Sequence, residues 1–203
     1  MNFENLQAAR ESCRIYSDKK VSRETLTHLV DVARMAPSGC NSQPWHFIIV
    51  DEPKALAKVV EALDDHGLTG CPWGAKVPAF ILICEEEAHL KPGVAEHYGS
   101  QHFAQMDIGM AAMGLCYEAT ALGLGTCMIG TMNQEKLHQA FEIPEERIVR
   151  LIITVGDPAK KSEPRKKARK DLEEIVSWRF NCQGFSHSIA ASGGPNRLNA
   201  ATI

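Results

Sequence analysis

The chain has 203 residues, enough to bury a full hydrophobic core in one large domain without the help of disulfides. Lys and Arg number 22 and Asp and Glu 25, so the net charge is −3, which argues against a general nucleic-acid binder with a basic domain. Charged residues interrupt the first stretch, so we expect no signal peptide, and apolar runs such as residues 77–84 are too short to cross a bilayer. These features predict a soluble protein of the cytoplasm that binds neither nucleic acid nor membranes.

Helical and strand-like segments alternate along the chain. A helix is expected over residues 3–12, and a second one begins after the N-cap Ser22 and ends before Pro37. The segments that follow are a loop at 36–44, a strand at 46–50, a helix from Pro53, a strand at 80–84, a long helix at 101–122, a strand at 126–129, a helix at 134–141 and a strand at 148–155. Strands separated by helices predict a mixed α/β or α+β layer fold.

The composition changes near residue 181, where Gly, Ser, Asn and Ala replace the apolar periodicity. We therefore expect one domain over residues 1–180 and a C-terminal tail over 181–203. The tail is interpreted as either disordered or draped over a partner subunit.

The cysteines are scattered, and no CxxC pair occurs among them. Their odd number and irregular spacing favour free thiols in a reducing compartment, and they disfavour both a disulfide framework and a zinc site. We predict no metal site. The seven positions are 13, 40, 71, 84, 116, 127 and 182.

Common catalytic motifs are missing from the chain, which has neither a GxSxG elbow nor an HExxH helix. Gly123, Gly125 and Gly130 superficially suggest a dinucleotide fingerprint, but they end a helix and open a strand, whereas the fingerprint needs a strand first and a helix after it. Gly123 is therefore interpreted as a helix C-cap. No side chain is predicted to be a required acid or base.

Two cationic clusters could hold a phosphate group, which calls for two or more cations and neutral donors. The first is Arg10-Glu-Ser12-Cys-Arg14, and the second is the basic run over residues 158–170. The first is equally readable as an ordinary helix end, and the second as a solvated loop or a nucleic-acid patch.

The loop over residues 36–45 carries four polar side chains between Pro37 and Pro44. Hydroxyl and amide groups on a rigid loop suit a flat heterocycle with alternating donors and acceptors, such as the pyrimidine edge of a flavin. A capped turn that leads into a strand is the alternative interpretation.

Three parts of the chain together resemble the nitroreductase family of flavin enzymes. They are Arg10-x-Ser-x-Arg-x-Tyr16, the stretch from Pro37 to Phe47, and Ala121 to Gly130 followed by Lys167-Ala-Arg169. Their order and spacing match across residues 5–178. The resemblance implies an α+β fold, a three-layer α/β/α sandwich around a central mixed β-sheet, and a homodimer with FMN at each of two subunit interfaces.

The resemblance also assigns residues to the cofactor. A first group would surround the ribityl phosphate, a loop would reach the flavin from the partner subunit, and a last pair would lie beside the isoalloxazine. In that order the expected cofactor-binding residues are Arg10, Ser12, Arg14, Lys167 and Arg169; Pro37, Ser38, Gly39, Asn41 and Gln43; and Ile129 and Gly130. The helix over 101–122 would form the dimer core, with ordinary intrachain core as the alternative, and the short linker before it implies an open site.

The implied activity is transfer of a hydride from NADH or NADPH through N5 of FMN to an electron-poor small-molecule acceptor of the nitroaromatic or quinone type, with ping-pong kinetics. Alternatives on the same scaffold are reductive dehalogenation, enone reduction and flavin fragmentation, and a non-enzymatic alternative is an FMN store or sensor. Cys13 and Cys40 are expected within reach of the cofactor, either as space-fillers or as redox-active thiols.

Overall fold

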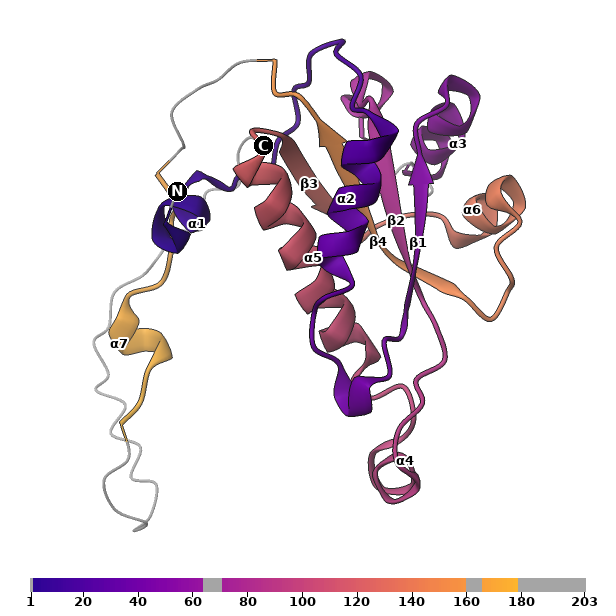
Figure 1. Cartoon of the computed structure of the whole chain (residues 1–203), viewed down its shortest axis with the longest axis vertical. Helices are drawn as coiled ribbons and strands as arrows, with labels where there is room; N and C mark the ends of the chain where they lie inside the picture. Colours follow the sequence, from indigo (N-terminus) through magenta and orange to yellow (C-terminus); the bar gives the residue numbers. More distant parts are fainter. Residues whose placement is uncertain (1, 64–70, 160–165, 179–203) are drawn as a thin grey trace, which may run out of the picture. The chain divides into compact units, whose positions relative to one another are not determined.

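The computed structural model describes residues 2–63, 71–159 and 166–178, so the expected tail lies outside the described residues. The chain divides into two compact units, residues 1–165 and 166–203. The first unit carries the sheet and helices α1 to α6, and the second carries the short helix α7 at Leu172–Ile175 (Figure 1). In the described residues no helix is both long and apolar enough to span a bilayer.

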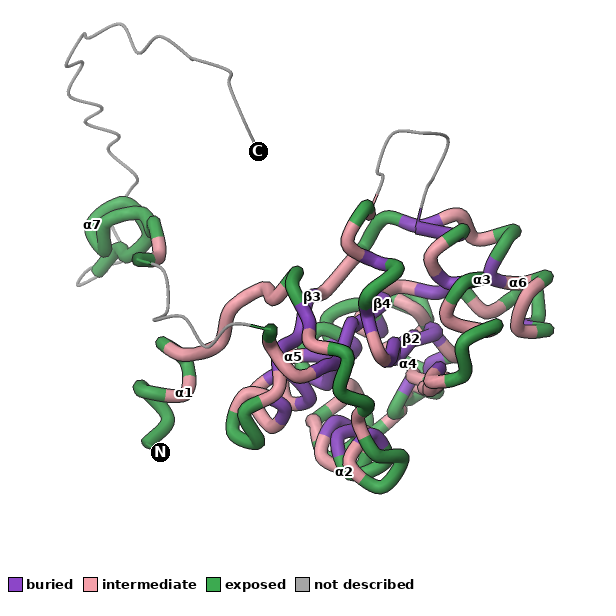
Figure 2. The backbone as a smooth tube through the Cα atoms, turned by 90° about the horizontal axis from the view of Figure 1, so that it is seen from above, coloured by how far each residue is buried: buried purple, intermediate pink, exposed green. Residues whose placement is uncertain are grey.

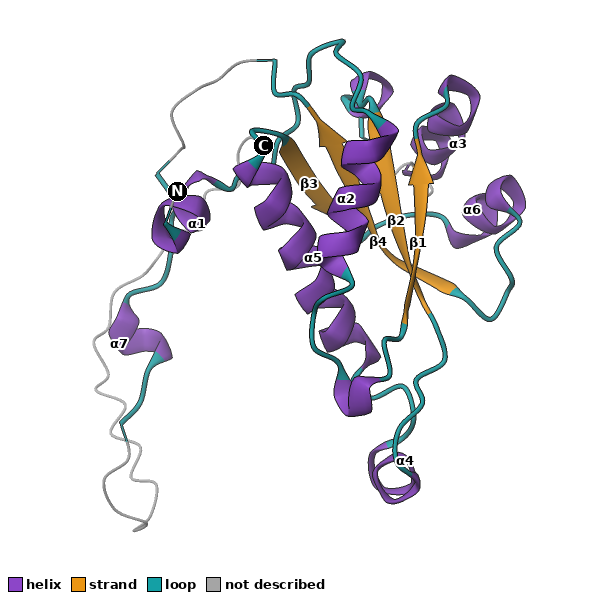
Figure 3. Cartoon of the chain, viewed as in Figure 1, coloured by secondary structure: helices purple, strands orange, loops and turns teal. Residues whose placement is uncertain are grey.

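Four strands form one sheet in the order β1-β2-β4-β3 (Figure 3). They are β1 at Trp45–Val50, β2 at Ala79–Glu85, β3 at Gly125–Ile129 and β4 at Ile148–Gly156. All three neighbouring pairs are antiparallel, so the expected mixed sheet is wrong for the described strands. The family resemblance implied that sheet, but the connection through α3 returns the chain from β1 to the adjacent strand β2 in the opposite direction. A parallel partner occurs at the isolated bridge between Ser12 and Thr126.

Helices cover both faces of this sheet and form the expected three layers. Helices α2 (Arg23–Ala33) and α5 (Ala104–Ala121) pack on one face, and α3 (Pro53–Leu63) and α6 (Gln134–Phe141) pack on the other. Strand β2 is buried at every position because it faces both helix layers. Alternate side chains point to opposite faces, and Figure 2 shows the buried residues gathered on the strands and on the inward sides of the helices.

The ends of several helices follow the local sequence signals. Ser22 accepts a hydrogen bond from the Thr25 amide at 3.1 Å and begins α2 as expected. Gly123 follows the end of α5 with φ +77°, and its amide donates to the Thr120 carbonyl at 3.0 Å, which confirms the C-cap interpretation. Helix α4 at Pro92–Tyr98 and the 3₁₀ turns at Gly39–Asn41 and Gly74–Lys76 were not expected.

Helix α1 is shorter than expected and ends at Ala9 (Phe3–Ala9), because the following residues extend along strand β3. The Cys13 amide donates to the Thr126 carbonyl at 2.8 Å, and Ser12 forms the parallel bridge with Thr126. Gly125 permits this approach, since a Cβ at that position would lie 2.7 Å from the Cβ of Cys13. Residues 12 and 13 therefore cover the outer edge of β3.

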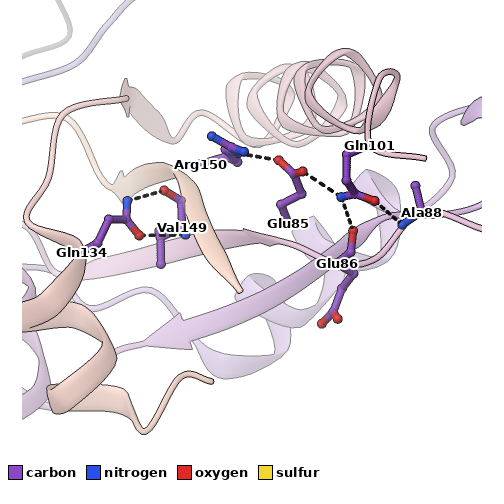
Figure 4. Close-up of polar contacts among 7 residues, drawn as sticks. All are labelled: Glu85, Glu86, Ala88, Gln101, Gln134, Val149 and Arg150. Atoms are coloured by element: carbon purple, nitrogen blue, oxygen red, sulfur yellow. Dashed lines mark hydrogen bonds and ion pairs between the residues drawn. The ribbon is translucent and has the colours of Figure 1, made fainter. Parts of the chain in front are cut away.

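A buried polar network joins the end of β2 to the segment that carries α4. Glu85 is 7% exposed and forms an ion pair with Arg150, and its other oxygen accepts a hydrogen bond from Gln101 Nε2 at 2.7 Å. Gln101 also accepts from the Ala88 amide at 2.6 Å and donates to the Glu86 carbonyl at 3.0 Å (Figure 4). This network anchors residues 86–101 to the sheet.

Replacing Arg150 with Met should lower the free energy of unfolding by about 2 kcal/mol, because Glu85 would remain buried without its cation. The effect should fall below that of a fully buried pair, since the Arg150 side chain is 31% exposed. Urea unfolding measures it, with Arg34→Met as the control, because Arg34 pairs with Asp31 at an exposed position. A loss in Arg150→Met no larger than in the control would contradict the anchoring role.

Two buried groups, the Cys84 thiol and the Tyr16 hydroxyl, bind their protons more tightly in the folded chain than in the unfolded chain. Burial raises the pKa of Cys84 to about 11 and raises the pKa of Tyr16 further above its ordinary value. The Tyr16 hydroxyl donates to the Cys13 carbonyl at 2.8 Å and lies 2.5 Å from Thr154 Oγ1. Both protons are kept in the folded state at pH values where the unfolded chain loses them.

The contribution of these two groups to the free energy of unfolding should therefore be fully present below about pH 8. It should fall as the pH rises toward 11, by at most about 1.4 kcal/mol per pH unit for each group. Urea unfolding at pH 8, 9 and 10 measures this slope. The Cys84→Ala variant should show a shallower alkaline slope, whereas Cys40→Ala, which removes an exposed thiol, should keep the original one. Equal slopes in Cys84→Ala and the parent would rule out Cys84 as a source of the dependence.

Candidate functional site

A polar loop, residues 38–43, holds an unusual backbone conformation. Cys40, Asn41 and Gln43 have φ values of 53°, 55° and 51°, in the left-handed region that residues other than glycine rarely adopt. Each such residue costs about 1 kcal/mol or somewhat more in backbone energy. Strained backbone that the surroundings keep in place is typical of ligand-binding sites. The Asn41 and Gln43 side chains are exposed, so they are available to a ligand.

Hydrogen bonds fix the shape and the position of this polar loop. Ser38 Oγ accepts from the Gln43 amide at 2.9 Å, which closes the loop on itself. Ser42 Oγ accepts from the His89 amide at 2.7 Å and ties the loop to the segment that carries α4. The Gly39 amide donates to Asp107 Oδ2 at 3.0 Å, which ties the loop to the start of α5.

The cationic segment, residues 10–14, lies along the outer edge of β3. Burial raises the pKa of Cys127, and the positive charges of Arg14 and Arg10 partly oppose this effect, so both guanidinium groups lie near that thiol. Among the described residues neither arginine forms an ion pair. Within the described ranges these two arginines lack carboxylate partners, and together with the Ser12 hydroxyl they form a donor set that suits an anion such as a phosphate.

The polar loop and the cationic segment lie near opposite ends of α5 (Figure 1). Asp107 contacts the loop near the start of α5. Burial raises the pKa of Cys116, in the second half of α5, and the positive charge of Arg10 partly opposes this rise, so Arg10 lies near that thiol. About 13 Å of helix axis separates Asp107 from Cys116, at about 1.5 Å per residue. The two predicted groups therefore do not contact each other within one chain, and Cys13 and Cys40 are separated in the same way.

The remaining predicted residues occupy two further places. Ile129 ends β3 and packs against the core between the sheet and helices α3 and α6, and Gly130 follows it at an exposed position. A Cβ at Gly130 would meet nothing within 4 Å in the described chain. Lys167 is half-buried and Arg169 exposed, and both belong to the second unit. Pro37 is exposed and precedes the polar loop.

Helix α5 exposes apolar side chains on its outer face, as the expectation of a dimer core requires. Met106 is 54% exposed and Met110 is 43% exposed, and Gly109 lies between them on the exposed surface. Asp107 in this helix is not among the site residues expected from the sequence. The sequence signal that could have indicated it is a lone acidic residue between the apolar neighbours Met106 and Ile108 near the start of the helix.

Comparisons with known proteins agree on one family. The family model described as the nitroreductase family matches residues 8–157. A protein of Archaeoglobus fulgidus, whose name refers to NADH dehydrogenase and NAD(P)H nitroreductase, is 30% identical over 179 residues, covering 85% of this chain and 89% of its own.

Solved structures show the same fold. A nitroreductase family protein from Clostridium difficile 630 is 29% identical with a TM-score of 0.73, covering 89% of this chain and 99% of its own. An FMN-dependent nitroreductase from Clostridium difficile R20291 is 21% identical with a TM-score of 0.71, covering 88% of this chain and 100% of its own. The family model matches residues 8–157, which are most of the chain and contain both the cationic segment and the polar loop, so this chain belongs to the nitroreductase family.

Proposed function

We propose that this protein is an FMN-dependent oxidoreductase that uses NADH or NADPH to reduce an electron-poor small molecule. The observation that carries the proposal is the family match over residues 8–157, which contains both the polar loop and the cationic segment. The names of the relatives support the two cofactors, since one refers to NAD(P)H and another to FMN dependence. Bound FMN would supply hydride transfer from the nicotinamide to an acceptor of the nitroaromatic or quinone type, in two half-reactions.

The donor set of the chain fits FMN. Arg10, Ser12 and Arg14 offer two cations and a hydroxyl to a phosphate. From the family resemblance we also propose Lys167 and Arg169 as cofactor-binding cations. Ser38, Gly39, Asn41 and Gln43, next to Pro37, would present hydroxyl, backbone and amide groups to the flavin ring. Ile129 and Gly130 would lie against its flat surface. We propose residues 1–180 as the region that builds the site.

The family resemblance and the exposed methionines of α5 support a site shared between two copies of the chain. The cationic segment of one copy would hold the phosphate, and the polar loop of the other would contact the flavin ring. The exposed methionines of α5 would lie in the interface between the copies.

The purified protein should be yellow, release FMN on denaturation, and lose its flavin absorbance when NADH or NADPH is added without oxygen. This bleaching separates a reductase from an FMN store or sensor. Nitroaromatic, quinone, halogenated and enone acceptors, with and without oxygen, then separate the alternative flavin reactions by their products. A protein that never binds FMN would contradict the proposal.

Replacing Arg10 or Arg169 with Ala should weaken FMN binding by about 1.5–3 kcal/mol, the range for hydrogen bonds to charged groups. Titration of the FMN-free protein by flavin fluorescence measures the dissociation constant. Arg34→Ala is the matched control, because this arginine pairs with Asp31 on α2. Unchanged affinity in both Arg10→Ala and Arg169→Ala would remove the proposed phosphate site.

A shared site predicts complementation between two inactive chains. Arg14→Ala and Asn41→Ala damage different halves of the site, so a mixed dimer should hold one intact site and one that lacks both groups. Co-expression with two affinity tags isolates the mixed dimer, and its activity should reach about half that of the parent per dimer. A stable mixed dimer no more active than either variant alone would place both residues in one site of one chain.

A further inference from the structure

We propose that Asp107 is a positioning residue that holds the polar loop in its cofactor-binding shape through the amide of Gly39. This inference rests on the proposed function, because it concerns the loop that would contact the flavin. Asp107 itself lies within α5 and would act through the loop backbone.

The surroundings of Asp107 are unusual for a carboxylate. Its residue is 4% exposed, and among the described residues no Lys, Arg or His pairs with it. Its neighbours along the helix, Met106 and Ile108, are apolar. Burial of a carboxylate without a cation is unfavourable unless hydrogen bonds compensate for the lost water. The bond from the Gly39 amide at 3.0 Å supplies such compensation.

The polar loop needs an external hold because its own conformation is strained. The Ser38 side chain and carbonyl accept from the Gln43 and Asn41 amides at 2.9 and 3.0 Å, which closes the turn. The His89 amide ties the loop to the segment that carries α4, whereas Asp107 ties it to the longer helix α5. Phe103, at the N-cap of α5, reinforces the contact, since a Cβ at Gly39 would lie 3.3 Å from the Cβ of Phe103.

The consequence is a coupling between α5 and the exposed amide side chains of the loop. Without the Asp107 acceptor, Cys40, Asn41 and Gln43 could return to ordinary backbone angles, and a smaller fraction of molecules would hold the binding shape. The apparent dissociation constant rises in inverse proportion to that fraction. A loop held correctly in one tenth of the molecules would bind FMN tenfold more weakly.

Two substitutions separate the hydrogen bond from other properties of Asp107. Asp107→Ala removes the acceptor, whereas Asp107→Asn keeps an amide oxygen that can accept from Gly39. Gln134→Ala is the matched control, because Gln134 exchanges two hydrogen bonds with the Val149 backbone, at 2.8 and 3.0 Å, on a different element (Figure 4). If Asp107→Ala does not fold, Asp107→Ser replaces it, because the serine hydroxyl is too short to reach the loop.

The first readout is hydrogen exchange of the backbone amides of residues 38–43 in the FMN-free proteins. We expect exchange about tenfold faster in Asp107→Ala and near the parent rate in Asp107→Asn and Gln134→Ala. The second readout is the FMN dissociation constant, which should rise about tenfold in Asp107→Ala, change less than threefold in Asp107→Asn, and stay unchanged in Gln134→Ala.

Unchanged exchange in the loop of Asp107→Ala would overturn the positioning role. An equal loss of FMN affinity in Gln134→Ala would also overturn it, because affinity would then follow stability alone. Failure of the parent protein to bind FMN would contradict the proposed function instead, and the exchange comparison would still decide whether Asp107 holds the loop.

Discussion

Strand β2 is buried along its whole length, and this burial requires a helix layer on each face of the sheet. Helix α5 supplies much of one layer through Ile108, Ala112 and Leu115. Its position fixes the candidate site, because its start holds the polar loop and its second half lies beside the cationic segment. The same helix therefore contributes to the core and sets the distance between the two groups of candidate site residues.

Local signals in the sequence were enough for elements whose ends depend on neighbouring residues. Helix α6 has the expected bounds, and Asn133 caps it by accepting from the Lys136 amide at 2.9 Å. The mixed sheet implied by the family resemblance was wrong for the described strands, because strand directions depend on where each connection returns. Helix α1 was predicted too long for a related reason, since its last expected residues pair with β3 instead.

The candidate site shows the same division between local and distant information. The residue types of the polar loop indicated a binding loop, but the left-handed backbone of Cys40, Asn41 and Gln43 was not predictable, because Gly39 was the residue best suited to that conformation. Tertiary contacts decide the matter, since Phe103 and Asp107 hold Gly39 against α5. The charge pattern of residues 10–14 was readable from the sequence, while its place beside β3 depended on the small size of Gly125.

The two buried carboxylates Glu85 and Asp107 have different kinds of partner, one within the fold and one at the candidate site. Glu85 faces Arg150 and a glutamine amide, and it anchors residues 86–101 to the sheet, a role that a structural network explains. Asp107 faces a backbone amide of a strained loop, and an apolar residue would suit its place in α5 better. Violations of local preference that serve no evident packing purpose tend to gather where ligands bind. Here one buried acid and three left-handed residues meet at a single loop, which favours that loop, rather than the regular core, as part of the candidate site.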